Sequence, residues 1–141
     1  MNSHCPFCSI VEENIERILR QTNHVFVVLS NPRLMEGHML VIPKRHVEKI
    51  SELIPLEQKE IFDELVNVEE KLLKNGASGC DINQHFRPFL EQSRLKINHL
   101  HFHVCPRELN DELYQVVQKH ERDVFRDVSQ EEISKYKTII M

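Results

Sequence analysis

Residues 98–105 read Asn-His-Leu-His-Phe-His-Val-Cys, so histidine alternates with an apolar residue along this stretch. A strand points successive side chains to opposite faces, which predicts that His99, His101 and His103 share one face while the apolar residues face the core. Imidazole titrates near neutrality, and three rings about 6.7 Å apart can bind a metal, contact phosphate or act as a nucleophile. A surface strand that merely carries histidines is the alternative, disfavoured because three histidines at strict period 2 are uncommon.

The composition is that of a globular protein with its own hydrophobic core. The chain has 141 residues, 40% hydrophobic and 28% charged, with no apolar run long enough to span a bilayer. Residues 1–10 lack the basic and apolar regions of a signal peptide, so we expect a cytoplasmic protein whose four cysteines are ligands or buried thiols. A formal charge of −4 argues against nucleic-acid and membrane partners.

The clearest helix covers residues 55–74, where aliphatic residues recur at helical spacing between Ile61 and Leu72 and Gly76 is placed to end it. Shorter helices are predicted at residues 11–19, after Pro106, and behind a capping box formed by Ser129 with Glu132. The helix after Pro106 would align five side chains on one face: Leu113, Val116, Val117, His120 and Val124.

Strands are predicted where β-branched and aromatic residues cluster between turn signals. They cover residues 24–29, 38–42, 79–84 and 95–105. The first two are joined by a short loop and should pair in antiparallel fashion. The pattern predicts an α+β fold with an antiparallel sheet of about five strands, a long helix between strands and helices at the C-terminal end.

Cys5 and Cys8 have the C-x2-C spacing that lets two thiolates reach one metal ion. A redox pair of the glutaredoxin kind is disfavoured, because such a pair follows a strand and only four residues precede Cys5. Two free thiols are the remaining alternative.

The triad segment from His99 to Cys105 resembles the signature of the histidine triad family. Three further motifs occur in the order and spacing of that family: Cys5-Pro-Phe-Cys8, Glu36-Gly-His38-Met-Leu-Val-Ile-Pro-Lys-Arg-His46 and Pro106-Arg107. The resemblance implies a histidine triad domain over residues 1–107, and we expect residues 108–141 to form a helical extension packed on the same domain. It also implies a homodimer.

The resemblance further implies a hydrolase or nucleotidyl transferase that acts at the α-phosphorus of a nucleoside phosphate, phosphoramidate or dinucleoside polyphosphate. The middle histidine, His101, would be the nucleophile and form a covalent nucleotidyl-histidine. His38 and His103 would line the phosphate, and Asn83 and Lys96 are further expected phosphate contacts. A non-enzymatic nucleotide-binding module is the alternative function.

In relatives with the N-terminal cysteine pair, a structural zinc site is completed by two histidines. The resemblance therefore assigns four zinc ligands: Cys5, Cys8, His46 and His99. A catalytic metal held by all three triad histidines is the competing hypothesis, but the outer two would lie about 13 Å apart at Cα on a strand.

The chain departs from the family pattern near the substrate. Leu95 and Lys96 stand where relatives carry Gly-Gln-Ser or Gly-Gln-Thr, so either Gln92-Ser93 is shifted by a loop insertion or Lys96 contacts phosphate instead. Ser30 or Asn31 would replace the usual ribose-binding Asp, which makes a nucleoside a less secure substrate. Arg87 and Arg94 are either anion contacts or solvated surface charges.

Overall fold

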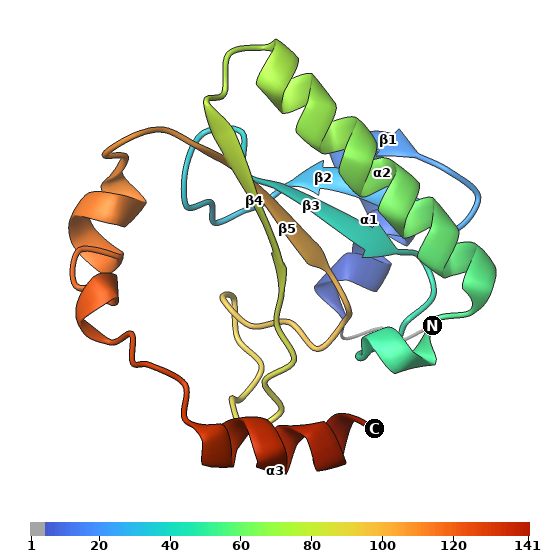
Figure 1. Ribbon diagram of the computed structural model, residues 1–141. Helices are drawn as coiled ribbons and strands as arrows, with labels where there is room; N and C mark the ends of the chain where they lie inside the picture. The colour runs from blue at the N-terminus through green and yellow to red at the C-terminus, as the bar shows by residue number, and fades with distance from the viewer. Residues whose placement is uncertain (1–4) are drawn as a thin grey trace. The chain divides into compact units, whose positions relative to one another are not determined.

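The computed structural model describes residues 5–141, which form two compact units that divide after Leu109. The first unit carries a five-stranded antiparallel sheet in the order β1-β2-β3-β5-β4 (Figure 1). Its strands are β1 (Ile18–Gln21), β2 (Val25–Leu29), β3 (Met39–Pro43), β4 (Gly79–Gln84) and β5 (Phe102–Arg107). The α+β fold with an antiparallel sheet is thereby confirmed.

Two helices of the first unit pack on the sheet, α1 (Pro6–Glu13) and α2 (Pro55–Lys74). The second unit contains α3 (Gln130–Ile140). Single helical turns lie at Ile15–Arg17, Ile50–Glu52, Leu113–Val117 and Glu121–Asp123. None of the helices within residues 5–141 is both long and apolar enough to cross a membrane.

The inner strand β2 is buried on both faces, and the sheet divides the hydrophobic core in two. Val25 and Val27 face the cluster that α2 covers, whereas Phe26 and Val28 face the cluster that α1 covers. Residues along a strand alternate between faces, so the uninterrupted apolar run of β2 is typical of a strand covered from both sides.

The register between β3 and β5 places the triad on the α1 face of the sheet. Leu40 pairs with His103, and directly paired residues point to the same face. Leu40 belongs to the α1 cluster, and the ring of Phe7 from α1 lies edge-on to His101 at 5.0 Å between centroids.

The predicted strand at residues 95–105 is wrong in extent, because β5 begins only at Phe102. The backbone before it bonds elsewhere: Leu100 N–H donates to Val47 O at 2.6 Å, and Ser93 and Lys96 close a turn on each other. His99 and His101 therefore lie outside the sheet, after a bend in which His99 N–H donates to Ile97 O at 2.9 Å.

The predicted helix at residues 11–19 is also wrong in extent. Pro6 occupies the first turn of α1 and Cys5 Sγ accepts from the Cys8 N–H at 3.5 Å, so the helix begins earlier, and it ends at Glu13. Ile18 belongs to β1, where it pairs with Val28. By contrast, α2 and β4 have the predicted bounds.

In the second unit the capping box before α3 is confirmed: Ser129 Oγ accepts from Glu132 N–H and the Glu132 carboxylate accepts from Ser129 N–H. The longer helix expected after Pro106 is wrong. Gln118 N–H bonds to Leu113 O and Glu121 N–H to Gln118 O, spacings that give single turns in place of a continuous α-helix.

Candidate active site

His101 is a half-buried histidine whose tautomer is fixed by a backbone carbonyl. Its Nδ1 lies 2.7 Å from the oxygen of His99, and a carbonyl oxygen only accepts, so Nδ1 carries the hydrogen. Nε2 is left with a lone pair. Burial lowers the pKa of His101, so the ring is neutral at physiological pH and this lone pair is available to an electrophile.

His38 and His103 form a chain of hydrogen bonds with a defined direction. The N–H of Leu34 donates to His38 Nδ1 at 3.1 Å, so His38 carries its hydrogen on Nε2. That nitrogen lies 2.9 Å from His103 Nδ1 and donates to it. His103 must then carry its own hydrogen on Nε2, which makes this atom a donor.

Burial keeps both rings of this chain neutral. It lowers the pKa of His38, with a further contribution from His101. Burial and the neighbouring histidines His101 and His38 lower the pKa of His103 to about 3. Neutral rings preserve the alternating donors and acceptors, because a protonated imidazole could no longer accept.

Gly37 sets the position of His38 at the start of β3. Its φ of +85° lies in the left-handed region that favours glycine, and a Cβ there would lie 3.2 Å from Cγ of Pro106. The Gly-His pair and the Pro that follows the triad thus fit against each other.

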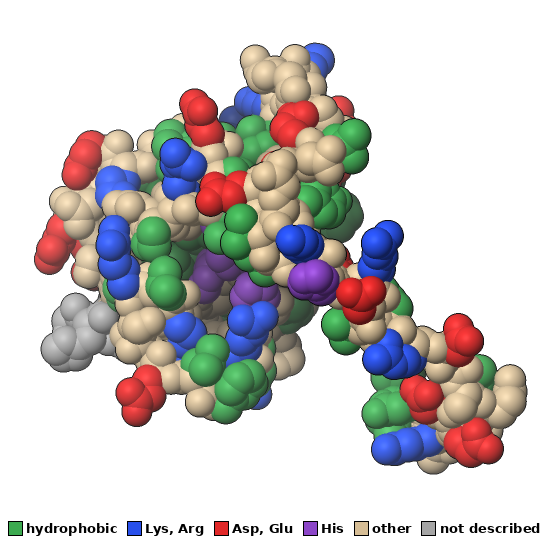
Figure 2. All heavy atoms as spheres, turned by 90° about the vertical axis from the view of Figure 1, so that its left-hand side faces the viewer, with side chains coloured by type: hydrophobic (Ala, Val, Ile, Leu, Met, Phe, Trp, Pro, Cys, Tyr) green, Lys and Arg blue, Asp and Glu red, His purple; other side chains and the backbone are tan. Residues whose placement is uncertain are grey.

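His38, His101 and His103 line one pocket of about 770 Å³, a size suited to a small-molecule ligand. Figure 2 shows histidine side chains within a hollow bordered by apolar and basic side chains. Basic residues of the lining are Arg17, Arg33, Arg87, Arg94 and Lys96. His99 is absent from this lining, so the hypothesis that the triad jointly holds a catalytic metal is not supported by the geometry.

The loop before the triad brings to the pocket both alternatives for the phosphate contact, Gln92-Ser93 and Lys96. Gln92, Ser93 and Lys96 all line it. Gln92 Oε1 accepts from Asn98 N–H at 3.1 Å and Ser93 Oγ accepts from Leu95 N–H at 3.2 Å. Those oxygens hold the loop in shape, which leaves Lys96 as the charged group of the three.

Asn83 lies on β4 directly opposite His103, but it does not line the pocket that contains His103. Its Nδ2 lies 3.3 Å from Nε2 of His85, and the His85 ring lies 5.2 Å from that of His103 between centroids. His85 lines the pocket and was missed from the sequence. The available signal was its position two residues after Asn83, which places it on the same face of an extended chain.

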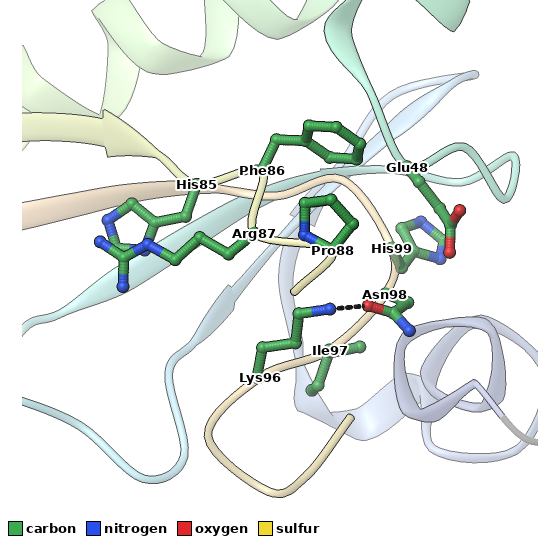
Figure 3. A pocket seen from close by; sticks show the side chains of 9 residues that line it. All are labelled: Glu48, His85, Phe86, Arg87, Pro88, Lys96, Ile97, Asn98 and His99. Atoms are coloured by element: carbon green, nitrogen blue, oxygen red, sulfur yellow. Dashed lines mark hydrogen bonds between the residues drawn. The ribbon is translucent and has the colours of Figure 1, made fainter. Parts of the chain in front are cut away.

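A second, smaller pocket of about 120 Å³ shares His85, Arg87, Lys96 and Ile97 with the first. Figure 3 shows His85 and Arg87 on one side of it and the Lys96 ammonium turned toward the Asn98 carboxamide. Ser30 and Asn31 line the larger pocket, where Ser30 Oγ donates to Pro32 O at 2.8 Å.

Four side chains gather into a group that could hold a metal ion: Cys5, Cys8, His46 and His99. Their ligand atoms lie within 4.8 Å of one another, with His99 Nδ1 3.3 Å from Cys5 Sγ and His46 Nδ1 3.5 Å from Cys8 Sγ. His99 Nε2 donates to Pro43 O at 2.8 Å, so its Nδ1 lone pair points into the group. Burial raises the pKa of Cys5 to about 11.

Comparison with known proteins adds sequence relatives to this geometry. The chain is 33% identical over 109 residues to an uncharacterized HIT-like protein of Methanocaldococcus jannaschii, covering 76% of this chain and 81% of that one. It is 25% identical over 108 residues to adenosine 5'-monophosphoramidase of Saccharomyces cerevisiae, covering 76% and 65%. It is 29% identical over 96 residues to bis(5'-nucleosyl)-tetraphosphatase of Schizosaccharomyces pombe, covering 62% and 50%.

The fold has a close counterpart among solved structures. A HIT family protein from Bacillus anthracis superposes with a TM-score of 0.76 at 22% identity, covering 99% of this chain and 96% of the other. The family model of the HIT domain matches residues 11–110, which include His38 and the whole triad. The chain therefore belongs to the histidine triad family.

Proposed function

We propose that this protein is a hydrolase or nucleotidyl transferase that cleaves at the α-phosphorus of a nucleoside phosphate, with His101 as nucleophile. One observation carries the proposal: a neutral His101 with its lone pair on Nε2 lies beside His103, which offers an N–H donor in the same pocket. In-line attack on phosphorus needs this combination of a free lone pair and a donor for the phosphoryl oxygens. The named activities of the two yeast relatives support a nucleotide substrate.

In the proposed first step, the Nε2 lone pair of His101 forms a bond to the α-phosphorus. The bond from phosphorus to the leaving group breaks, and its electron pair goes with the leaving group. In the second step, an oxygen of water or another acceptor attacks phosphorus, the N–P electron pair returns to Nε2, and the proton of the attacking group passes to solvent. The His99 carbonyl stabilises the charged intermediate through the Nδ1–H of His101.

His38 acts through His103 in this scheme. By donating to His103 Nδ1 it keeps the hydrogen of His103 on Nε2, where charge develops on the phosphoryl oxygens. We propose Lys96 as a further phosphate contact from the pocket wall and Asn83 as a residue that orients His85 beside it.

We also propose that the cysteine and histidine group binds a structural zinc ion. Tetrahedral zinc with ordinary bond lengths places sulfur and nitrogen ligands about 3.6 Å apart. The sulfur to nitrogen distances within hydrogen-bonding range in this group are 3.3, 3.5 and 3.7 Å, so the residues fit the ion. Four protein ligands would leave no open position, so zinc would tie α1 to the two histidine segments without taking part in the reaction.

Covalent trapping tests the proposed reaction. After acid-free quenching of a reaction with a labelled adenosine phosphoramidate or dinucleoside tetraphosphate, we expect an acid-labile label on His101. Because the nucleophile is lost, His101→Ala should form no adduct and lose turnover by roughly a thousandfold or more. His120→Ala, in the second unit, is the matched control and should keep both. Full turnover by His101→Ala, or label on another side chain, would contradict the proposal.

A further inference from the structure

The pocket around His101 has a charge opposite to that of the chain. The chain carries 22 acidic and 18 basic residues, a net charge of −4. The lining of the pocket nevertheless contains five basic side chains, Arg17, Arg33, Arg87, Arg94 and Lys96, and one acidic side chain, Glu91. A concave site with such an excess of one sign concentrates ligands of the opposite charge.

These five cations are not neutralised inside the protein. Elsewhere in the first unit arginines pair with carboxylates: Arg20 with Glu64, Arg45 with Glu57 and Arg107 with Asp81. Among the ion pairs within residues 5–141, none uses a basic residue of the pocket. Lys96 and Arg94 instead donate to the neutral carboxamides of Asn98 and Asn31. Their charge is therefore available to an anionic ligand.

Two of the cations extend this charge away from His101. Arg87 and Lys96 line the pocket of the triad and also the smaller pocket that adjoins it (Figure 3). Burial lowers the pKa of both His85 and His103, and the positive charge of Arg87 lowers each pKa further. The guanidinium of Arg87 is therefore close enough to act on the triad. A ligand bound at His101 thus has a second cationic region within reach of its next groups.

Resting on the proposed function, we propose that the substrates are phosphoanhydrides, and that Arg87 and Lys96 bind the phosphates beyond the α-phosphate. When the P–O bond of an anhydride breaks, the leaving phosphate keeps the electron pair and gains one negative charge, which cations stabilise directly. An amine leaving group of a phosphoramidate takes the electron pair as well but departs as a neutral amine only after gaining a proton, so neighbouring positive charge stabilises its departure less directly. The pocket therefore favours an anionic leaving group over an amine.

Relative turnover of two substrates tests this assignment. We expect Arg87→Gln and Lys96→Gln each to lower the ratio of kcat/KM for a dinucleoside tetraphosphate to kcat/KM for adenosine phosphoramidate by about tenfold or more. Arg87→Lys keeps the charge and should restore part of the ratio. Lys59→Gln removes one charge from an exposed pair on α2 and should leave the ratio unchanged. An unchanged ratio in both pocket variants would overturn the inference and leave the proposed reaction standing.

Binding gives a second readout that does not depend on turnover. With His101→Ala as the background, calorimetry should show adenosine tetraphosphate binding at least tenfold tighter than adenosine monophosphate, a preference that Arg87→Gln removes. Equal affinities would overturn the inference even if the protein proves inactive. Failure of the proposed function is recognised separately, by turnover that survives His101→Ala.

Discussion

At the scale of single residues, the site depends on which ring nitrogen carries each hydrogen. His101 and His103 are neighbours on the same extended face, yet their tautomers are opposite, because one ring donates to a carbonyl and the other accepts from His38. The distinction originates at the N–H of Leu34, which lies outside the recognised motifs. Alternation alone would have described the two rings as equivalent.

Nitrogen-15 NMR of the labelled protein should show His38 and His103 with hydrogen on Nε2 and His101 with hydrogen on Nδ1. Because the pKa of His103 is about 3, its ring should not titrate between about pH 5 and about pH 8. The unfolded chain binds that proton near its ordinary pKa, so His103 should make the free energy of unfolding fall as the pH falls below about 6.5.

Leu34→Pro removes the N–H donor and should mix the tautomers of His38 and His103, whereas Leu34→Ala keeps the donor and should preserve them. A His103 resonance that titrates near neutrality would contradict the assigned hydrogen-bond chain.

Gly37→Ala should destabilise the protein by about 1–2 kcal/mol, since a left-handed conformation strains any side chain and the new Cβ would press on Pro106. Urea unfolding measures the change. Gly79→Ala is the control, because a Cβ at Gly79 meets no atom within 4 Å and its φ is outside the left-handed region. An equal loss of unfolding free energy in the two variants would show that the left-handed conformation at Gly37 does not require glycine.

At the scale of elements, the sequence predicts correctly those segments in which a regular hydrophobic period is bounded by turn residues. The bounds of α2 and β4 follow from periodicity and turn residues alone. The start of β5 does not, because the alternation of side chains in the sequence continues through a bend at Asn98 and His99 and past the bond from Leu100 N–H to Val47 O, which lie outside the sheet. The start of α1 depends on the Cys5 side chain, whose Sγ accepts from the Cys8 N–H, a capping contact that the C-x2-C spacing does not predict.

The sequence motifs predict most residues of the candidate site but not all of them. The motifs that carry the family resemblance located His38, His101 and His103, which line one pocket, and the four residues of the cysteine and histidine group. His85 was missed because no motif includes it and its proximity to His103 depends on the pairing of β4 with β5.

Zinc removal should act first on α1, because this helix and its cap supply two of the four proposed ligands. We expect about one zinc per chain by elemental analysis. Chelation should lower the melting temperature and speed hydrogen exchange in residues 5–13 before it affects β2 and β3. Cys8→Ser should lose the metal, while Cys80→Ser, outside the group, should retain it. A zinc content unaffected by Cys8→Ser would show that the group is not the binding site.

At the scale of the whole molecule, the proposed active site lies within one unit. Every residue lining the triad pocket lies between Pro6 and His103, and the chain divides into compact units only after Leu109. The architecture of this unit is that of the HIT domain, and most of the basic residues that line its pocket lie in loops. Packing of the extension on the domain and assembly into a homodimer stay predictions.

A chain ending at Leu109 should fold and hydrolyse its substrate as the full-length chain does, because it contains the complete sheet and pocket. Circular dichroism and turnover measure this, and light scattering of both forms tests the expected dimer. Changed substrate preference on truncation would instead assign residues 110–141 a role in selection.

His99 contributes to two places at once: its ring nitrogen joins the cysteine and histidine group, and its carbonyl oxygen holds the hydrogen of His101. Any residue has a carbonyl, but the ring is specific to histidine and fixes where that carbonyl points. A substitution at position 99 should thus disturb two different contacts at once. A saturation mutagenesis screen for activity should find position 99 as intolerant as position 101, although the His99 side chain lies outside the pocket that holds the proposed nucleophile.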